Sequence, residues 1–210
     1  MRVLALAAGA ALAVFAPAAA QEPGVVAATI RLPSAGAAYH GGTHVFLDGR
    51  ARLTCSSHGG FTSGVEPPAA PGTTAIADYF ATFAGELALD PPLARSAVVH
   101  PIEGRARMVE RLTFAERREG VTVLDAEIVA FDLRGGGMPE GVLVRESPGT
   151  VSSGRTTVTT VSRGRYRVES SFDVWLELSL DGGRSWSRAA APVRMTLAPA
   201  DADRRATPAD

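Results

Sequence analysis

Hydrophobic and polar residues alternate most regularly between Phe172 and Leu180. Apolar side chains occupy every second position of this stretch, and the positions between them are polar or charged except for Trp175. Because successive side chains of a strand point to opposite faces, the pattern predicts a strand with one buried face. The residues 181–183, Asp-Gly-Gly, favour the positive φ angles of a hairpin turn. We therefore expect the chain to turn back here, and alternation resumes from Val193.

The turn itself carries a short motif. Residues 179–186 fit the pattern S-x-D-x-G-x-[ST]-W, which resembles the Asp-box hairpin of sialidases and of many unrelated secreted β proteins. The resemblance implies a structural hairpin in which Asp181 binds amides of its own turn and Trp186 packs beneath it, with Ser179 and Gly183 completing the motif. A sialidase needs several such boxes and an arginine cluster, so a single box does not predict that activity.

Shorter alternating runs fill most of the remaining chain, and Gly- and Pro-rich turns separate them. We expect strands at 25–32, 45–53 (a pair broken at Asp48-Gly49), 76–89, 96–102, 121–133, 142–146, 156–161 and 166–169. The segment 105–119 fits a helix by residue type and a strand by parity, and the strands on both sides favour a strand. Within 121–133 the apolar parity shifts between Ile128 and Val129, which predicts a β-bulge.

Many short strands without helices between them predict an all-β fold, and we expect an antiparallel β-sandwich. We place a single domain at 21–197, with a long loop at 56–74 that contains many Gly and Pro residues. The residues 198–210 are mostly Ala, Pro, Asp and Arg, so we expect a disordered tail.

The first twenty residues predict export. Arg2 precedes an apolar run that is too short to span a bilayer, and small residues lead up to Ala20. This is the pattern of a secretory signal peptide at 1–20, cleaved near Ala20, so we expect a secreted or periplasmic protein. No apolar helix follows Leu197, and we expect no membrane anchor.

The amino-acid composition indicates which kinds of binding partner to expect. The formal net charge is −1, and all 21 basic residues are Arg, because Lys is absent along with Asn. Both missing residues use AT-rich codons, so a GC-rich bacterial genome explains the arginine count. No basic excess remains to bind a polyanion, and we expect no nucleic-acid partner.

A longer stretch is similar to a known group of proteins. The run 127–197 contains EIVAFDL, VLVRESPG, YRVESSFDVWLELSLDGGRSW and VRMTL. It resembles uncharacterised secreted bacterial β-domain proteins, many of which carry a C-terminal PEP-CTERM sorting tail. The resemblance implies an extracellular or envelope β domain and no particular activity. This sequence departs from the pattern of the group after Leu197, so we expect the protein to lack the sorting anchor.

Three clusters have residue types that can do chemistry. The first has the spacing H-x3-H…C-x2-H and consists of His40, His44, Cys55 and His58. Imidazole and thiolate ligands suit zinc or copper, so one hypothesis is a metal held by this Gly-rich segment. Against it, Cys55 shares strand parity with Leu53, which predicts that the thiol points into the core.

The second cluster is a row of carboxylates at equal strand parity, namely Glu169, Asp173, Glu177 and Asp181. Neighbours in the row are about 13 Å apart at a strand rise of ~3.3 Å per residue, whereas glycosidase carboxylates are ~5–9.5 Å apart. A partner from an adjacent strand, such as Glu127 or Glu146, is needed to close the gap. A solvated sheet face is the favoured interpretation.

The third possibility is a nucleophile, but no G-x-S-x-G motif occurs. The sequence therefore favours a non-enzymatic exported protein that binds an extracellular polymer or protein, or has a structural role. Asp173, Trp175 and Glu177 are the candidate contact surface, because Trp175 is an aromatic residue on the polar face. The alternative hypothesis is zinc or copper binding, and the third is a glycan-active enzyme; no other cofactor is expected.

Overall fold

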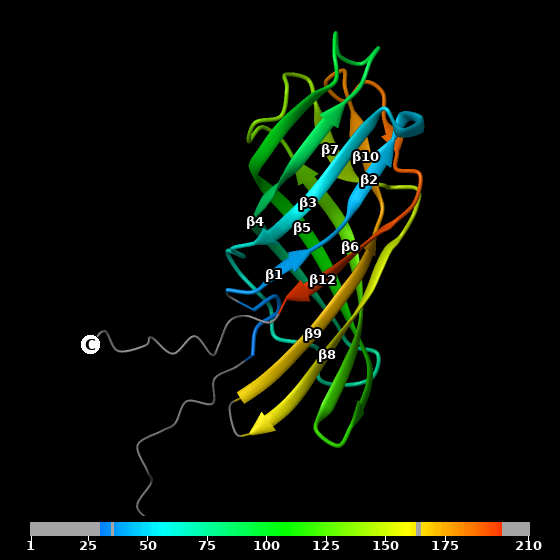
Figure 1. Ribbon diagram of the computed structural model, residues 1–210. Coiled ribbons are helices and arrows are strands. Elements are labelled where there is room, and N and C mark those ends of the chain that lie inside the picture. The colour runs from blue at the N-terminus through cyan, green and yellow to red at the C-terminus, as the bar shows by residue number, and fades with distance from the viewer. Residues whose placement is uncertain (1–29, 35, 163–164, 199–210) are drawn as a thin grey trace, which may run out of the picture.

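The computed structural model describes residues 30–34, 36–162 and 165–198, and this part of the chain is built from antiparallel strands (Figure 1). The strands are β1 (Ala38–His40), β2 (Thr43–Phe46), β3 (Ala51–Gly59), β4 (Thr74–Leu89), β5 (Val98–Arg118), β6 (Val121–Leu133), β7 (Leu143–Glu146), β8 (Ser152–Ser162), β9 (Arg165–Val174), β10 (Leu176–Ser179), β11 (Ser187–Arg188) and β12 (Val193–Ala198). Within the described residues the only helical element is the 3-10 turn η1 (Leu47–Gly49). The prediction of an all-β antiparallel fold is confirmed.

The strands close into a barrel. Hydrogen-bonded neighbours follow the order β6-β5-β4-β3-β1-β12-β9-β8, and β8 pairs back with β6, which joins the two ends of this series. The closing pair runs from Val121 opposite Thr159 to Ile128 opposite Ser152. A β-sandwich is therefore not confirmed, because its two sheets would have free edges where this sheet is joined.

A second group of short strands continues from the barrel. Strand β6 pairs with β7 at Asp132 and Leu133, β7 pairs with β10, and β10 pairs with β11. On the other side β2 pairs with β3, and the Ala190 N–H donates to the Val45 carbonyl at 2.8 Å. The long strands thus form the barrel at one end of the molecule, and the short strands β2, β7, β10 and β11 lie at the other end (Figure 1). The chain passes between the two groups at Trp175, between β9 and β10.

The interior is filled by one continuous apolar cluster. The largest fully buried side chains include Tyr79, Phe46, Phe83, Phe172, Leu53, Leu112 and Leu124. The bulge predicted in β6 is confirmed, because Ala130 pairs with Val109 while Ile128 pairs with the next residue, Glu110. Val129 is the extra residue of the bulge. The parity shift predicted that its side chain faces inward, but the side chain is 38% exposed. Phe131, two residues further, is 7% exposed and continues the core.

Other boundaries differ from the sequence prediction. The expected strands at 96–102 and 105–119 form one strand, β5, so the prediction of strand over helix is confirmed. Strand β3 extends to Gly59, which shortens the expected loop at 56–74. Of the expected strand at 25–32, Leu32 forms an isolated bridge with Val65, and 25–29 lie outside the described residues, as do the predicted signal peptide and 199–210 of the tail.

A glycine in the closing strand tests this packing. A Cβ at Gly154 would lie 2.6 Å from a ring carbon of Phe172 and would also contact the Ser171 carbonyl oxygen. We expect Gly154→Ala to lower the free energy of unfolding by ~1–3 kcal/mol, the usual cost of overpacking. Gly149→Ala is the matched control, because a Cβ there meets open space, and its effect should stay within ~0.5 kcal/mol. Urea denaturation of both variants measures the difference, and equal stability would contradict the described packing.

Candidate functional site

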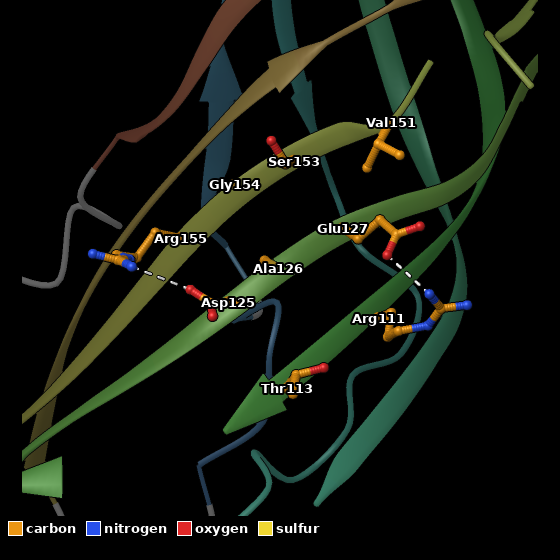
Figure 2. A pocket seen from close by; sticks show the side chains of 9 residues that line it. All are labelled: Arg111, Thr113, Asp125, Ala126, Glu127, Val151, Ser153, Gly154 and Arg155. Carbon is orange, nitrogen blue, oxygen red and sulfur yellow. Dashed lines mark hydrogen bonds and ion pairs between the residues drawn. The ribbon is translucent and has the colours of Figure 1, made fainter. Parts of the chain in front are cut away.

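A groove crosses the outer face of the barrel over β5, β6 and β8 (Figure 2). Its volume is about 360 Å³. The lining residues are Arg111, Thr113, Asp125, Ala126, Glu127, Val151, Ser153, Gly154 and Arg155. Their polar side chains come from three neighbouring strands, so the register of the barrel brings them together.

Two ion pairs run along the groove, and each joins adjacent strands. Arg111 Nη1 donates to Glu127 Oε2 at 2.8 Å, and Arg155 Nη2 donates to Asp125 Oδ1 at 3.3 Å (Figure 2). Each pair follows from the strand register, in which Arg111 lies opposite Glu127 and Asp125 lies opposite Arg155. The four formal charges therefore cancel within the groove, and the hydroxyl of Ser153, opposite Glu127, adds a further donor and acceptor.

One end of the groove is apolar. Val151 is 62% exposed, and Val129 next to it follows the last pair of the closing register, Ile128 opposite Ser152. Trp175 is half-buried, and its main-chain N–H donates to Ser152 Oγ at 2.9 Å. It has the same strand parity as Asp173, which lies opposite the groove residue Ser153. An aromatic residue therefore follows the strand that borders the groove.

The other two residues of the predicted contact surface are already paired. Asp173 forms an ion pair with Arg194 at 3.2 Å. Glu177 accepts from Arg145 Nη2 at 2.7 Å and from the Ser147 hydroxyl at 3.1 Å. Trp175 is itself partly covered, with the Arg188 guanidinium 5.5 Å from its ring centre.

The acidic row predicted from the sequence needs a second carboxyl group from an adjacent strand, and Glu146 on β7 is a candidate. Glu146 Oε1 accepts from Ser152 Oγ at 3.2 Å, at the point where β8 begins. The pKa of Glu146 is raised to about 7, mainly by partial burial and to a smaller extent by the Glu127 and Glu177 carboxylates, although the bonds from Ser152 oppose the shift. Glu146 and Glu127 are the two residues named above as possible partners for the acidic row, and both Glu127 and the row residue Glu177 are near enough to affect the pKa of Glu146. Glu169 is exposed and lies elsewhere on β9.

The predicted Asp-box hairpin lies between β10 and β11. Asp181 Oδ1 accepts from the Ser185 main-chain N–H at 2.9 Å, and Ser179 Oγ accepts from the Gly183 N–H at 2.8 Å. The Ser185 hydroxyl also donates to Asp181 at 2.6 Å, and these bonds hold the pKa of Asp181 below its usual range. Trp186 Nε1 donates to the Gly183 carbonyl at 3.0 Å. All of these bonds lie within the turn, so they define a local structural unit.

Three of the four candidate metal ligands lie near one another in the interior, and the fourth, His40, does not. His40 is exposed, and its Nδ1 is 2.6 Å from the Ser56 carbonyl oxygen. The other three are buried inside the barrel, and the predicted inward orientation of Cys55 is confirmed. His44 lies opposite Leu53 on the neighbouring strand, and Cys55 and His58 follow on β3.

The interior around these three side chains is apolar. His44, Cys55 and His58 border a cavity of about 20 Å³ together with Met108 and Met195. Burial lowers the pKa values of both histidines to about 4 and raises that of the Cys55 thiol to about 12. Within the described residues, no three His, Cys, Asp or Glu side chains are placed to hold one metal ion. The zinc or copper hypothesis gains no support from this arrangement.

A buried polar network in the barrel was not predicted from the sequence. Glu110 is 2% exposed and accepts from the Tyr79 hydroxyl at 3.2 Å. Farther along, the Tyr39 hydroxyl donates to Ser170 Oγ at 2.9 Å, and Ser170 is 2.8 Å from Thr156 Oγ1. A signal was present, because Glu110 has the same strand parity as two buried residues of β5, Met108 and Leu112.

Burial shifts the pKa of the carboxyl group in this network. It raises the pKa of Glu110 to about 7, although the bond from Tyr79 opposes the shift. Among the ion pairs of the described residues, none includes Glu110. The carboxyl group is sealed in the core, so it can affect stability without reaching a ligand.

No protein family, curated protein or solved structure matches this chain. Among the described residues, no helix has the length and apolar character needed to span a membrane.

Glu110 makes a testable contribution to the pH dependence of stability. A carboxyl pKa raised from 4.5 to about 7 on folding favours the folded state fully below pH 4.5, and this advantage is lost as the pH rises to 7. Relative to wild type, Glu110→Gln should therefore gain about 3 kcal/mol in free energy of unfolding between pH 4 and pH 8. Urea denaturation at four pH values measures this gain.

Comparison with the wild type removes the histidine contribution, because both proteins contain His44 and His58. Glu103→Gln is the control, since Glu103 is an exposed carboxylate on the same strand. An equal pH-dependent gain in the control would contradict the assignment to Glu110.

Proposed function

We propose that this protein is an exported binding protein whose outer groove takes a neutral, hydroxyl-rich polymer such as a polysaccharide. The observation that supports the proposal is the cancellation of charge in the groove, where each carboxylate already accepts from an arginine. A charged ligand would have to break one of these pairs. A sugar can add hydrogen bonds to them, because its hydroxyl groups both donate and accept.

The apolar end of the groove suits the same class of ligand. A sugar ring has apolar C–H faces that pack on aromatic side chains, and the half-buried Trp175 directly follows β9, the strand that pairs with β8 of the groove. Ser153 and Thr113 supply hydroxyl groups farther along the groove. The predicted signal peptide would place this surface where such polymers occur.

Removing one ion pair without leaving an unpaired charge tests the groove. We expect the double variant Asp125→Ala/Arg155→Ala to bind its polysaccharide at least tenfold more weakly, because it loses both the donors and the acceptors at one end. The measurement begins with a screen of neutral polysaccharides by affinity electrophoresis and continues with calorimetry on the best ligand.

The control is Arg52→Ala/Asp90→Ala, which removes a comparable pair at 2.8 Å between β3 and the end of β4. Its affinity should match the wild type. Equal losses in the two double variants, or no binding by the wild type to any neutral polysaccharide in the screen, would refute the proposal.

A second candidate function is glycan cleavage at the apolar end of the groove. It is favoured by Glu146, whose raised pKa of about 7 suits a general acid, beside the carboxylates Glu127 and Glu177. These two are held by Arg111 and Arg145.

Glu146→Gln separates cleavage from binding. If the groove cleaves its ligand, the wild type releases reducing ends and Glu146→Gln loses at least a hundredfold in rate, while its affinity for the polysaccharide is kept. The rate should also fall as the pH rises through about 7, where Glu146 loses its proton. If the wild type releases no reducing ends from a polysaccharide that it binds, glycan cleavage is excluded for that ligand.

A further inference from the structure

A second hollow lies at the end of the barrel remote from β2 and β7. It has a volume of about 330 Å³ and is bordered by the β5–β6 and β8–β9 hairpins, which reach the lower end of the molecule in Figure 1. The lining residues are Ile30, Pro67, Arg117, Gly120, Thr122, Val158, Thr160 and Tyr166. Thr122 and Val158 are buried core-facing residues of the barrel wall, so this hollow is the mouth of the barrel.

The mouth combines apolar walls with one cation. Ile30, Pro67, Val158 and Tyr166 supply the apolar surface, and Tyr166 is 41% exposed, so part of its ring is accessible to a ligand. Mouths of β-barrels are common sites for small ligands, and a mainly apolar lining with a few polar groups is typical of them.

Arg117 is positioned at the mouth without a carboxylate partner. Its Nε donates to Thr122 Oγ1 at 3.0 Å, and its guanidinium carbon is 5.8 Å from the ring centre of Phe114. None of the ion pairs in the described part of the chain includes Arg117, whereas the adjacent Arg118 pairs with Glu116 at 2.9 Å. The Nη groups of Arg117 are therefore available to a bound anion.

We propose that the barrel mouth binds a small amphipathic carboxylate. The carboxylate would accept from the guanidinium of Arg117, and the apolar part would lie against Ile30, Val158 and Tyr166. A hollow of about 330 Å³ has space for roughly ten groups the size of a water molecule, whose share of liquid volume is ~30 Å³. Octanoate, a straight-chain carboxylate, is of this size and serves as the probe.

The first experiment compares octanoate with octanol, which has the same chain but no charge. Calorimetry on the full chain should show that octanoate binds at least tenfold more tightly than octanol. Arg117→Gln should remove this preference and leave the affinity for octanol unchanged. Arg118→Gln is the matched control, and its affinity for both probes should equal that of the wild type.

The second experiment locates the site. Tyr166→Ala should weaken both octanoate and octanol by at least threefold, because it removes apolar contact area and no charge. The groove variant Asp125→Ala/Arg155→Ala should bind octanoate like the wild type, so failure of this site is distinguishable from failure of the polysaccharide site. Absence of octanoate binding, equal affinity for the two probes, or an equal loss in Arg118→Gln would overturn the proposal.

Discussion

Strand β6 has to satisfy two partners on one edge, and the rest of the structure depends on how it does so. From Val121 to Ile128 the edge pairs with β8, and at Asp132 and Leu133 it pairs with β7. The bulge at Val129 lies between these two segments. A bulge bends the strand and increases its local twist, so β6 can leave the barrel wall there and continue into the second group of strands.

The change of partner along β6, from β8 to β7, also explains where the candidate functional residues lie. Strands β7 and β8 separate at this point, so Glu146 at the end of one faces Ser152 at the start of the other. Ser152 bonds in turn to the backbone of Trp175, the residue at which β9 gives way to β10. The half-buried carboxyl, the tryptophan and the apolar end of the groove are therefore consequences of one topological feature. Before the bulge at Val129, the regular pairing of β5, β6 and β8 brings each arginine of the groove opposite its carboxylate partner.

The alternation of apolar and polar residues predicted much of the fold. The features that it did not predict depend on pairing between strands that are far apart in the sequence. Alternation was enough for β4 and for the bulge in β6, because each depends on neighbouring residues. For β5 the parity left a helix possible at 105–119, and the strands expected on both sides decided in favour of a strand. Closure of the barrel depends on the register of β8 against β6, which no local pattern contains. The same limit applies to the candidate sites. The spacing of His40 and His44 suggested a shared ligand, yet Gly41 and Gly42 lie between β1 and β2, and the His40 side chain is exposed while that of His44 is buried. The groove could not be predicted, because Arg111, Glu127 and Ser153 come from three strands.

The buried ionisable groups impose opposing demands on the closed barrel. His44 and His58 have folded pKa values of about 4, so their contribution to stability is present above pH 6.5 and is lost as the pH falls toward 4. Glu110, with a pKa of about 7, acts in the opposite direction between pH 4.5 and 7. Because two histidines oppose one carboxyl over the shared range, these three groups together should make stability rise with pH up to about 6.5. About one pH unit higher the histidines no longer change, and Glu110 has lost most of its proton, so these groups favour the folded barrel most near weakly acidic to neutral pH.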